Sequence, residues 1–181
     1  DSFDNFIRNE VDTGKFVPSL AVLSPGPGSP SDFKLSHTIG TMIDRKVPIF
    51  GVCLGLQGLI EHFGGDLDIL DYPMHGKPSP IQREYSDEAE HYLPNDVFRG
   101  ICKEFTVARY HSLHGNKKTH PKELKITAST AEGIIMAVQH ESKPIAAVQF
   151  HPESILTLPK NGMKIIRNAL KLSSSQYDNG V

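Results

Sequence analysis

A glycine-flanked cysteine is the sharpest chemical signal in the sequence. Residues 51–55 are GVCLG, the Gly-x-nucleophile-x-Gly spacing of a nucleophile elbow, with Cys53 where many hydrolases carry serine. An apolar run precedes this pentapeptide and a helical pattern follows it. A helix that begins here would favour the Cys53 thiolate and would point free N–H groups at a reacting carbonyl. The alternative is an inert cysteine buried at the end of a strand.

A cysteine nucleophile needs a base, and His151 is the candidate. It directly follows the apolar run 145–150, so we expect it at a strand end, at the edge of the sheet where α/β active sites gather. Glu153 lies two residues further on, close enough to accept a hydrogen bond from the imidazole and to orient it. His-Pro-Glu alone is also typical of a solvated turn. In combination with Cys53, it predicts a catalytic triad.

A second pair of histidines suggests a different chemistry. His111 and His114 are three residues apart and could belong to a metal site. No nearby carboxylate or cysteine completes a recognisable set of ligands, so we expect no metal here.

Alternating strands and helices must position these residues. The helices expected from apolar spacing are a short one around Phe3 to Val11, then 33–45, 54–63 and 160–172. The strands expected from apolar runs are 20–23, 47–52, 104–109, 124–129, 134–139 and 145–150. This order predicts one α/β domain, mostly parallel in its first half, with an antiparallel addition near residues 124–150. The polar tail 173–181 is expected to fray.

Length and composition exclude several classes of protein. The chain has 181 residues, 38% hydrophobic and 22% charged, which suits one globular domain and not a disordered chain. Its net charge of -2 argues against a nucleic-acid partner. The most apolar stretch, 47–60, is interrupted by glycines and is shorter than the ~20 residues that cross a bilayer, so we expect no membrane span. Cys53 and Cys102 are the only cysteines, which favours a reducing compartment, the cytoplasm.

Three segments together resemble one family. They are SPGPGSP at 24–30, GVCLGLQ at 51–57 and HPES at 151–154. Their order and spacing are similar to those of the triad, or class I, glutamine amidotransferases from residue 20 to residue 172. MHGK at 74–77 and YHSL at 110–113 look like the chorismate-utilising branch. The resemblance implies a three-layer, flavodoxin-like fold, with a mostly parallel sheet, helices on both faces and a small antiparallel addition.

The resemblance also implies a role for each matching residue. Cys53 would attack the side-chain amide of L-glutamine, His151 would act as base and then as acid, and Glu153 would orient it. Ammonia would leave, and water would cleave the remaining thioester. Backbone N–H groups of Gly28 and Leu54 would form the oxyanion hole. The implied substrate contacts are Gly26, Pro27, Gly28, Gln57, Ser112 and Leu113. No cofactor and no metal is implied.

The function implied by the resemblance is ammonia delivery to a chorismate-binding synthase, either a separate subunit or a fused domain. Anthranilate formation, and hence tryptophan synthesis, is the main interpretation. The glutaminase of aminodeoxychorismate synthase, serving folate, is the nearest alternative. A non-catalytic, partner-binding relative is another, against which the intact triad argues. A cysteine hydrolase acting on a different acyl substrate is a third, which the loop 24–30 and Gln57 disfavour.

The sequence departs from the family pattern at its start. Family members usually open with an apolar strand that leads into an Asp-Ser-Phe turn, followed by a helix and a second strand. Here Asp1-Ser2-Phe3 opens the sequence, and only residues 4–23 precede the proline-rich loop. We therefore expect a single amidotransferase domain over residues 1–181 that lacks part of the family's N-terminal strand region.

Overall fold

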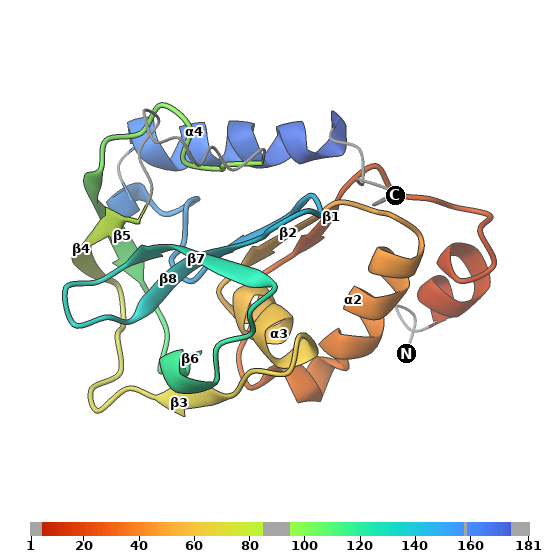
Figure 1. Cartoon of the computed structure of the whole chain (residues 1–181), viewed down its shortest axis with the longest axis horizontal. Coiled ribbons are helices and arrows are strands. Elements are labelled where there is room, and N and C mark those ends of the chain that lie inside the picture. The colour runs from red at the N-terminus through yellow and green to blue at the C-terminus, as the bar shows by residue number, and fades with distance from the viewer. Residues whose placement is uncertain (1–4, 85–94, 158, 175–181) are drawn as a thin grey trace.

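A seven-stranded sheet with helices on both faces forms the centre of the molecule. The structure is a computed structural model, and it describes residues 5–84, 95–157 and 159–174. The strands of the large sheet are β1 (Ala21–Leu23), β2 (Ile49–Val52), β4 (Lys77–Arg83), β5 (Glu104–Arg109), β7 (Leu124–Ser129), β8 (Ile135–His140) and β9 (Ile145–Val148). Helices α2 (Leu35–Asp44) and α3 (Leu54–His62) cover one face, and α4 (Pro159–Leu170) covers the other (Figure 1).

A smaller sheet and short helical segments complete the described fold. The smaller sheet pairs β3 (Leu67–Ile69) with β6 (Leu113–Gly115). The short helical segments are Ile7–Val11, Pro30–Phe33, Lys117–Thr119, Ile155–Thr157 and Lys171–Ser174. Phe3, at the start of the expected first helix, lies outside the described residues. Residues 175–181, most of the tail that we expected to fray, lie outside them as well.

The predicted three-layer α/β fold is confirmed, with a larger antiparallel part than expected. The strand order is β1-β2-β9-β8-β7-β4-β5, in which β1, β2 and β9 are parallel neighbours. The four remaining pairs, from β9–β8 to β4–β5, are antiparallel. The antiparallel part therefore extends beyond residues 124–150 through β5 and through β4, a strand that the sequence did not predict.

Two prolines hide β4 from sequence analysis. Its sequence, KPSPIQR, lacks backbone donors at Pro78 and Pro80, which normally argues against a strand within a sheet. The strand pairs with β5 along its length but with β7 only at Gln82 and Arg83. Backbone N–H groups alternate in direction along a strand: the Arg83 N–H points toward β5 and the Glu84 N–H toward β7. The nitrogens of Pro78 and Pro80 therefore point toward β7, in a part of β4 that β7 does not reach. The missing donors therefore cost no sheet hydrogen bond.

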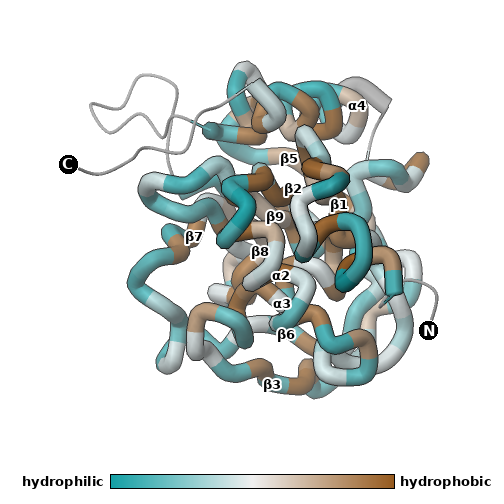
Figure 2. The backbone as a smooth tube through the Cα atoms, turned by 90° about the vertical axis from the view of Figure 1, so that its right-hand side faces the viewer, coloured by the Kyte–Doolittle hydropathy of each residue, from teal (hydrophilic) through white to brown (hydrophobic). Residues whose placement is uncertain are grey.

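The parallel strands are buried on both faces because alternate side chains enter two different cores. In β2, Ile49 packs on the side of α2 and α3, whereas Phe50 and Val52 pack on the side of α4. Strand β9 repeats this alternation, and all four of its residues are buried. Figure 2 shows the apolar strands β2, β9 and β8 between the helical layers. Each fully buried aliphatic side chain contributes roughly 1.5–3 kcal/mol, so these strands form a rigid base for the residues that follow them.

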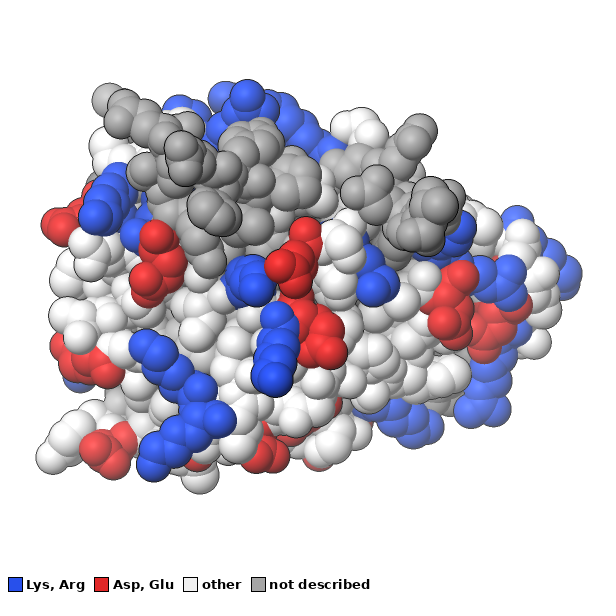
Figure 3. All heavy atoms as spheres, viewed as in Figure 1, with Lys and Arg blue, Asp and Glu red and all other residues white. Residues whose placement is uncertain are grey.

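One face of the molecule carries mixed charge. Lys and Arg are interspersed with Asp and Glu over the face seen in Figure 3. Across the described ranges, each helix is too short or too polar to cross a bilayer.

Strand β1 is the edge of the large sheet, and its outer side has no strand partner among the described residues. Val22, in the middle of β1, is 57% exposed. An exposed apolar edge is a template for pairing with another chain, and a lysine on such an edge blocks that pairing. We predict that Val22→Lys lowers self-association at high protein concentration, with a change in the free energy of unfolding of about 0.5 kcal/mol or less.

The measurement is sedimentation velocity over a concentration series, together with thermal unfolding. Val17→Lys is the matched control, because Val17 is 56% exposed but lies outside the strand. An equal loss of association in both variants would show that general surface hydrophobicity, and not the β1 edge, drives the contact.

Candidate active site

Cys53 lies at a sharp turn between β2 and α3. Its backbone has φ 52° and ψ -97°, a conformation that costs a residue with a side chain about 1–3 kcal/mol. The Cys53 N–H donates to Val148 O of β9 at 2.8 Å, and α3 begins at the next residue. The predicted nucleophile elbow is therefore present, with the cysteine at its apex.

The two glycines of the elbow are required by close packing. A side-chain carbon at Gly51 would lie 2.8 Å from the carbonyl carbon of Gly55. One at Gly55 would lie 2.5 Å from the carbonyl oxygen of Leu23 in β1. Both distances are too short for a carbon atom, so only glycine lets the start of α3 lie this close to β1 and β2.

His151 and Glu153 form the second part of the predicted triad. The His151 Nδ1 and Glu153 Oε1 atoms are 2.6 Å apart. With Nδ1 donating to the carboxylate, Nε2 is the acceptor nitrogen of the ring. This Nε2 atom is buried and has no hydrogen-bond partner in the described structure. The pair thus leaves one basic nitrogen free to take a proton.

Strand pairing brings the two parts of the predicted triad to the same edge of the sheet. Val52 pairs with Val148 in the parallel register of β2 and β9. Cys53 and His151 therefore follow the carboxyl ends of neighbouring strands, where α/β active sites form. In the described structure no hydrogen bond joins the Cys53 thiol to His151.

Burial controls the protonation of Cys53. Cys53 is only 6% exposed, and this burial raises the pKa of its thiol to about 11. Hydrogen bonds from the Leu54 N–H and the Gln149 side chain lower the pKa, but by less than burial raises it. The helix start was expected to favour the Cys53 thiolate, but burial favours the neutral thiol more strongly, because the loss of hydration outweighs the hydrogen bonds.

Gln149 is a contact of the nucleophile that sequence analysis missed. It is fully buried, and its Nε2 lies 3.5 Å from the Cys53 Sγ. Its Oε1 accepts a hydrogen bond from Gln57 Nε2 at 3.4 Å, which fixes the amide orientation. Gln149 directly follows β9. The only sign of it in the sequence was a polar amide inside the predicted buried strand 145–150.

The segment around Leu113 is held by several hydrogen bonds. The Leu113 carbonyl accepts from Gln57 Nε2 at 3.1 Å and from His111 Nδ1 at 2.9 Å. The other ring nitrogen, His111 Nε2, accepts from Arg109 Nε at 3.1 Å. Burial lowers the pKa of His111 to about 4, which keeps the ring neutral. Both of its nitrogens are occupied by protein groups, so His111 has no free nitrogen for a metal.

The structure brings some of the predicted substrate residues together. Gln57 is 3% exposed, and its bonds to Leu113 O and Gln149 use both hydrogens of its amide nitrogen. The neighbouring Ser112 is half-buried, and its carbonyl accepts from the Leu70 N–H at 2.7 Å. Leu113, Gln57 and Cys53 are thus linked by one hydrogen-bonded network.

The proline-rich loop after β1 lies over the start of α3. Gly26 is close to Leu54, because a side-chain carbon at Gly26 would lie 3.1 Å from Leu54 Cδ2. Gly28 has φ 85°, and a side chain there would meet Asp32 at 2.6 Å. Pro27 is exposed, and in the described structure neither it nor Gly28 hydrogen-bonds to Cys53. The loop therefore lies close to Leu54, one of the two residues predicted to form the oxyanion hole.

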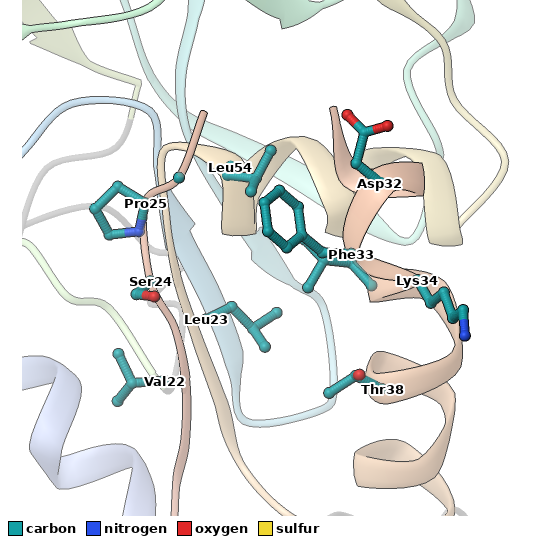
Figure 4. A pocket seen from close by; sticks show the side chains of 11 residues that line it. Val22, Leu23, Ser24, Pro25, Asp32, Phe33, Lys34, Thr38 and Leu54 are labelled. Carbon is teal, nitrogen blue, oxygen red and sulfur yellow. The ribbon is translucent and has the colours of Figure 1, made fainter. Parts of the chain in front are cut away.

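A cavity of about 610 Å³ borders this loop. Its lining runs from the loop after β1 to the start of α2, with Leu54 and the ring of Phe33 between them (Figure 4). Gly26 and Leu54 are the two predicted site residues in its lining, which does not reach Cys53.

Comparison with known proteins agrees with this geometry. Residues 4–172 match the model of the family "Glutamine amidotransferase class-I". An anthranilate synthase of Azospirillum brasilense is 46% identical over 154 residues, which make up 84% of this chain and 20% of that protein. The aminodeoxychorismate/anthranilate synthase component 2 of Bacillus subtilis is 39% identical over 93% of this chain and 80% of its own length.

A solved structure has the same fold. A Thermoplasma acidophilum protein described as a GMP synthase subunit has a TM-score of 0.75 and 26% identity, covering 91% of this chain and 77% of that one. The family match spans the elbow, the His151–Glu153 pair and the loop that lies over Leu54. The chain belongs to the class-I glutamine amidotransferase family.

Proposed function

We propose that this chain is the glutaminase of an anthranilate synthase, which hydrolyses L-glutamine and delivers ammonia to a chorismate-binding synthase. The observation that carries the proposal is the free, buried Nε2 of His151, oriented by Glu153 at the strand next to the Cys53 elbow. The names of the Azospirillum and Bacillus relatives support the choice of synthase. The chain spans only a fifth of the Azospirillum protein, in keeping with a fused or separate synthase partner.

The triad geometry supports a two-step acyl transfer. The Cys53 Sγ attacks the side-chain carbonyl carbon of glutamine while the thiol proton passes to His151 Nε2. The N–H groups of Leu54 and Gly28 stabilise the oxyanion. When the tetrahedral intermediate collapses, His151 returns the proton to the departing nitrogen, so ammonia leaves and a glutamyl thioester remains. Water, deprotonated by the same nitrogen, then attacks the thioester; the C–S bond breaks, glutamate leaves, and His151 returns the proton to the Cys53 sulfur.

The high pKa of Cys53 means that attack by the sulfur must accompany the transfer of its proton. Because the resting thiol is protonated and buried, the sulfur becomes nucleophilic only as its proton moves to His151. Glu153 supports the imidazolium that this transfer creates. A protonated thiol is also a poor nucleophile toward adventitious electrophiles, so attack is confined to a substrate held in place.

We assign substrate binding to the residues around the Leu113 network. Gly26 and Pro27 close the site from the loop side, and the backbone of Ser112 and Leu113 holds the amino-acid end of glutamine. Since both hydrogens on the Gln57 nitrogen are used within the protein, Gln57 contacts the substrate only through its Oε1 and otherwise positions Leu113 and Gln149. A free thiol persists most readily in a reducing compartment, and the proposal therefore includes a cytoplasmic location.

Aminodeoxychorismate synthesis is the second candidate function, because the name of the Bacillus relative includes both synthases. The two are separated by supplying the chain with each purified synthase, chorismate and glutamine. The proposal expects anthranilate with the anthranilate synthase and much less aminodeoxychorismate with the other. The opposite preference would move the chain to folate synthesis without affecting the glutaminase assignment.

Cys53→Ala tests whether the chain only supplies ammonia. The nucleophile is then absent, but the chorismate chemistry lies in the partner. We expect the rate of glutamine-dependent anthranilate formation to fall about 10³-fold or more, as it does when the nucleophile of other catalytic triads is removed. The activity of the complex with ammonium salts should be kept. Anthranilate fluorescence measures both activities.

Cys102→Ala is the matched control, since Cys102 is an exposed free thiol outside the elbow, and both activities should persist in it. Loss of the ammonium-dependent activity in an assembled Cys53→Ala complex would refute ammonia delivery. Retention of the glutamine-dependent activity would refute Cys53 as the nucleophile.

Gln149→Leu tests the hydrogen bond to the nucleophile. Gln149 lowers the pKa of Cys53, so its removal should raise that pKa further and slow thioester formation by about tenfold, the effect of one buried hydrogen bond. The pH profile of Cys53 inactivation by a glutamine-derived chloroketone should shift to higher pH. A purely structural role would lower stability without moving the profile.

Gln139→Leu provides the control for stability. Gln139 is an equally buried glutamine on β8, and its amide meets the backbone of Asn95. The Gln139→Leu variant should be less stable, while its pH profile of Cys53 inactivation stays unchanged. If both variants shift the profile equally, Gln149 has no specific effect on the thiol.

A further inference from the structure

Arg109 is a buried cation with unused donors. It ends β5, the strand at one edge of the large sheet, and is only 6% exposed. Its Nε donates to His111 Nε2 at 3.1 Å. Within the described ranges, neither Nη1 nor Nη2 of this guanidinium has a hydrogen bond or an ion pair. Glu132 interacts electrostatically with this guanidinium, but no hydrogen bond joins the two side chains.

Arg83 is a second buried arginine of the same sheet, and its guanidinium is satisfied within the chain. It lies on the neighbouring strand β4 and is 4% exposed. Its Nη2 is 2.8 Å from Asp96 Oδ2, and its Nη1 donates to the Ile101 carbonyl at 2.6 Å. The guanidinium of Arg109 lacks such partners, so its two nitrogens are available to something that is not part of the described chain.

A cavity of about 450 Å³ lies next to Arg109. One part of its lining is apolar, from Leu70, Met74 and Ile134. Another part carries the exposed carboxylates of Asp71 and Glu132. The cavity therefore combines a buried positive charge, an apolar wall and a negatively charged rim.

We propose that this cavity binds an apolar α-amino acid. The ligand carboxylate accepts from Nη1 and Nη2 of Arg109 in the two-pronged geometry that guanidinium favours. Its ammonium group lies toward Asp71 and Glu132. Its side chain packs against the apolar wall. A ligand with only a negative charge would be repelled by the rim. One with only a positive charge would leave Nη1 and Nη2 of Arg109 without an acceptor, so the zwitterion fits best. The site is separate from Cys53 and does not depend on the proposed glutaminase reaction.

Calorimetric titration of the purified chain tests the proposal with three matched probes. L-Leucine carries both charges, isoamylamine lacks the carboxylate, and 4-methylpentanoate lacks the ammonium group. We expect L-leucine to bind, 4-methylpentanoate to bind about tenfold more weakly, and isoamylamine to give no heat of binding. No binding of leucine, methionine or phenylalanine, or equal binding of isoamylamine and leucine, would overturn the proposal.

Three variants locate the binding. Arg109→Gln, if folded by thermal unfolding, should lose leucine binding. Asp71→Asn combined with Glu132→Gln changes only exposed side chains, so it should fold normally and weaken leucine binding about tenfold. Glu123→Gln removes an exposed carboxylate outside the cavity and should leave binding unchanged. An unchanged affinity in the rim variant would refute the site.

Cys53→Ala separates this proposal from the glutaminase reaction. Leucine binding should persist in that variant, whether or not the chain proves to be a glutaminase. Loss of leucine binding there would place the ligand at the glutamine site and overturn the proposal.

Discussion

The close approach of α3 to β1 and β2 is the constraint on which the active site depends. Gly51 and Gly55 leave no room for a side chain, so the chain must turn sharply between them. That turn gives Cys53 its φ of 52° and buries its sulfur at the end of β2. The backbone strain is supported by two fully packed cores on either face of the sheet. The geometry of the nucleophile is thus a consequence of helix-to-strand packing.

Burial of the nucleophile has a cost in reactivity that the surrounding polar groups reduce. The Leu54 N–H and Gln149 are donors to the sulfur, and His151 presents a free acceptor nitrogen at the neighbouring strand. The same Gln149 is tied through Gln57 to the Leu113 carbonyl. His111 bonds to that carbonyl as well, and Arg109 in turn donates to His111. The nucleophile and the proposed substrate segment are therefore fixed relative to each other by side-chain hydrogen bonds.

Much of this arrangement could be predicted from the sequence, because the strongest signals are local. The apolar runs at 47–52 and 145–150 predicted the buried strands β2 and β9. Motif spacing predicted a triad of Cys53, His151 and Glu153, which the structure places after these neighbouring strands. Three elements were missed for physical reasons. The prolines of β4 argue against a strand unless the pairing side is known, and β3 and β6 are each three residues long.

Contacts between distant segments were also beyond the sequence. Gln149 and Arg109 each look like a polar residue at the end of a strand, and only the tertiary structure shows that one meets the thiol and the other lines a cavity. The thiol pKa was predicted in the wrong direction, because a helix start is visible in the sequence, whereas the depth of burial is not.

The central claim is that Cys53 is a buried, protonated thiol that reacts only with a correctly placed glutamine group. The most direct test compares two electrophiles on the same protein near neutral pH, with the adducts located by peptide mass spectrometry. Iodoacetamide should modify the exposed Cys102 first and spare Cys53, whereas a glutamine-derived chloroketone should modify Cys53 and spare Cys102. Rapid modification of Cys53 by iodoacetamide, or of Cys102 alone by the chloroketone, would contradict this account.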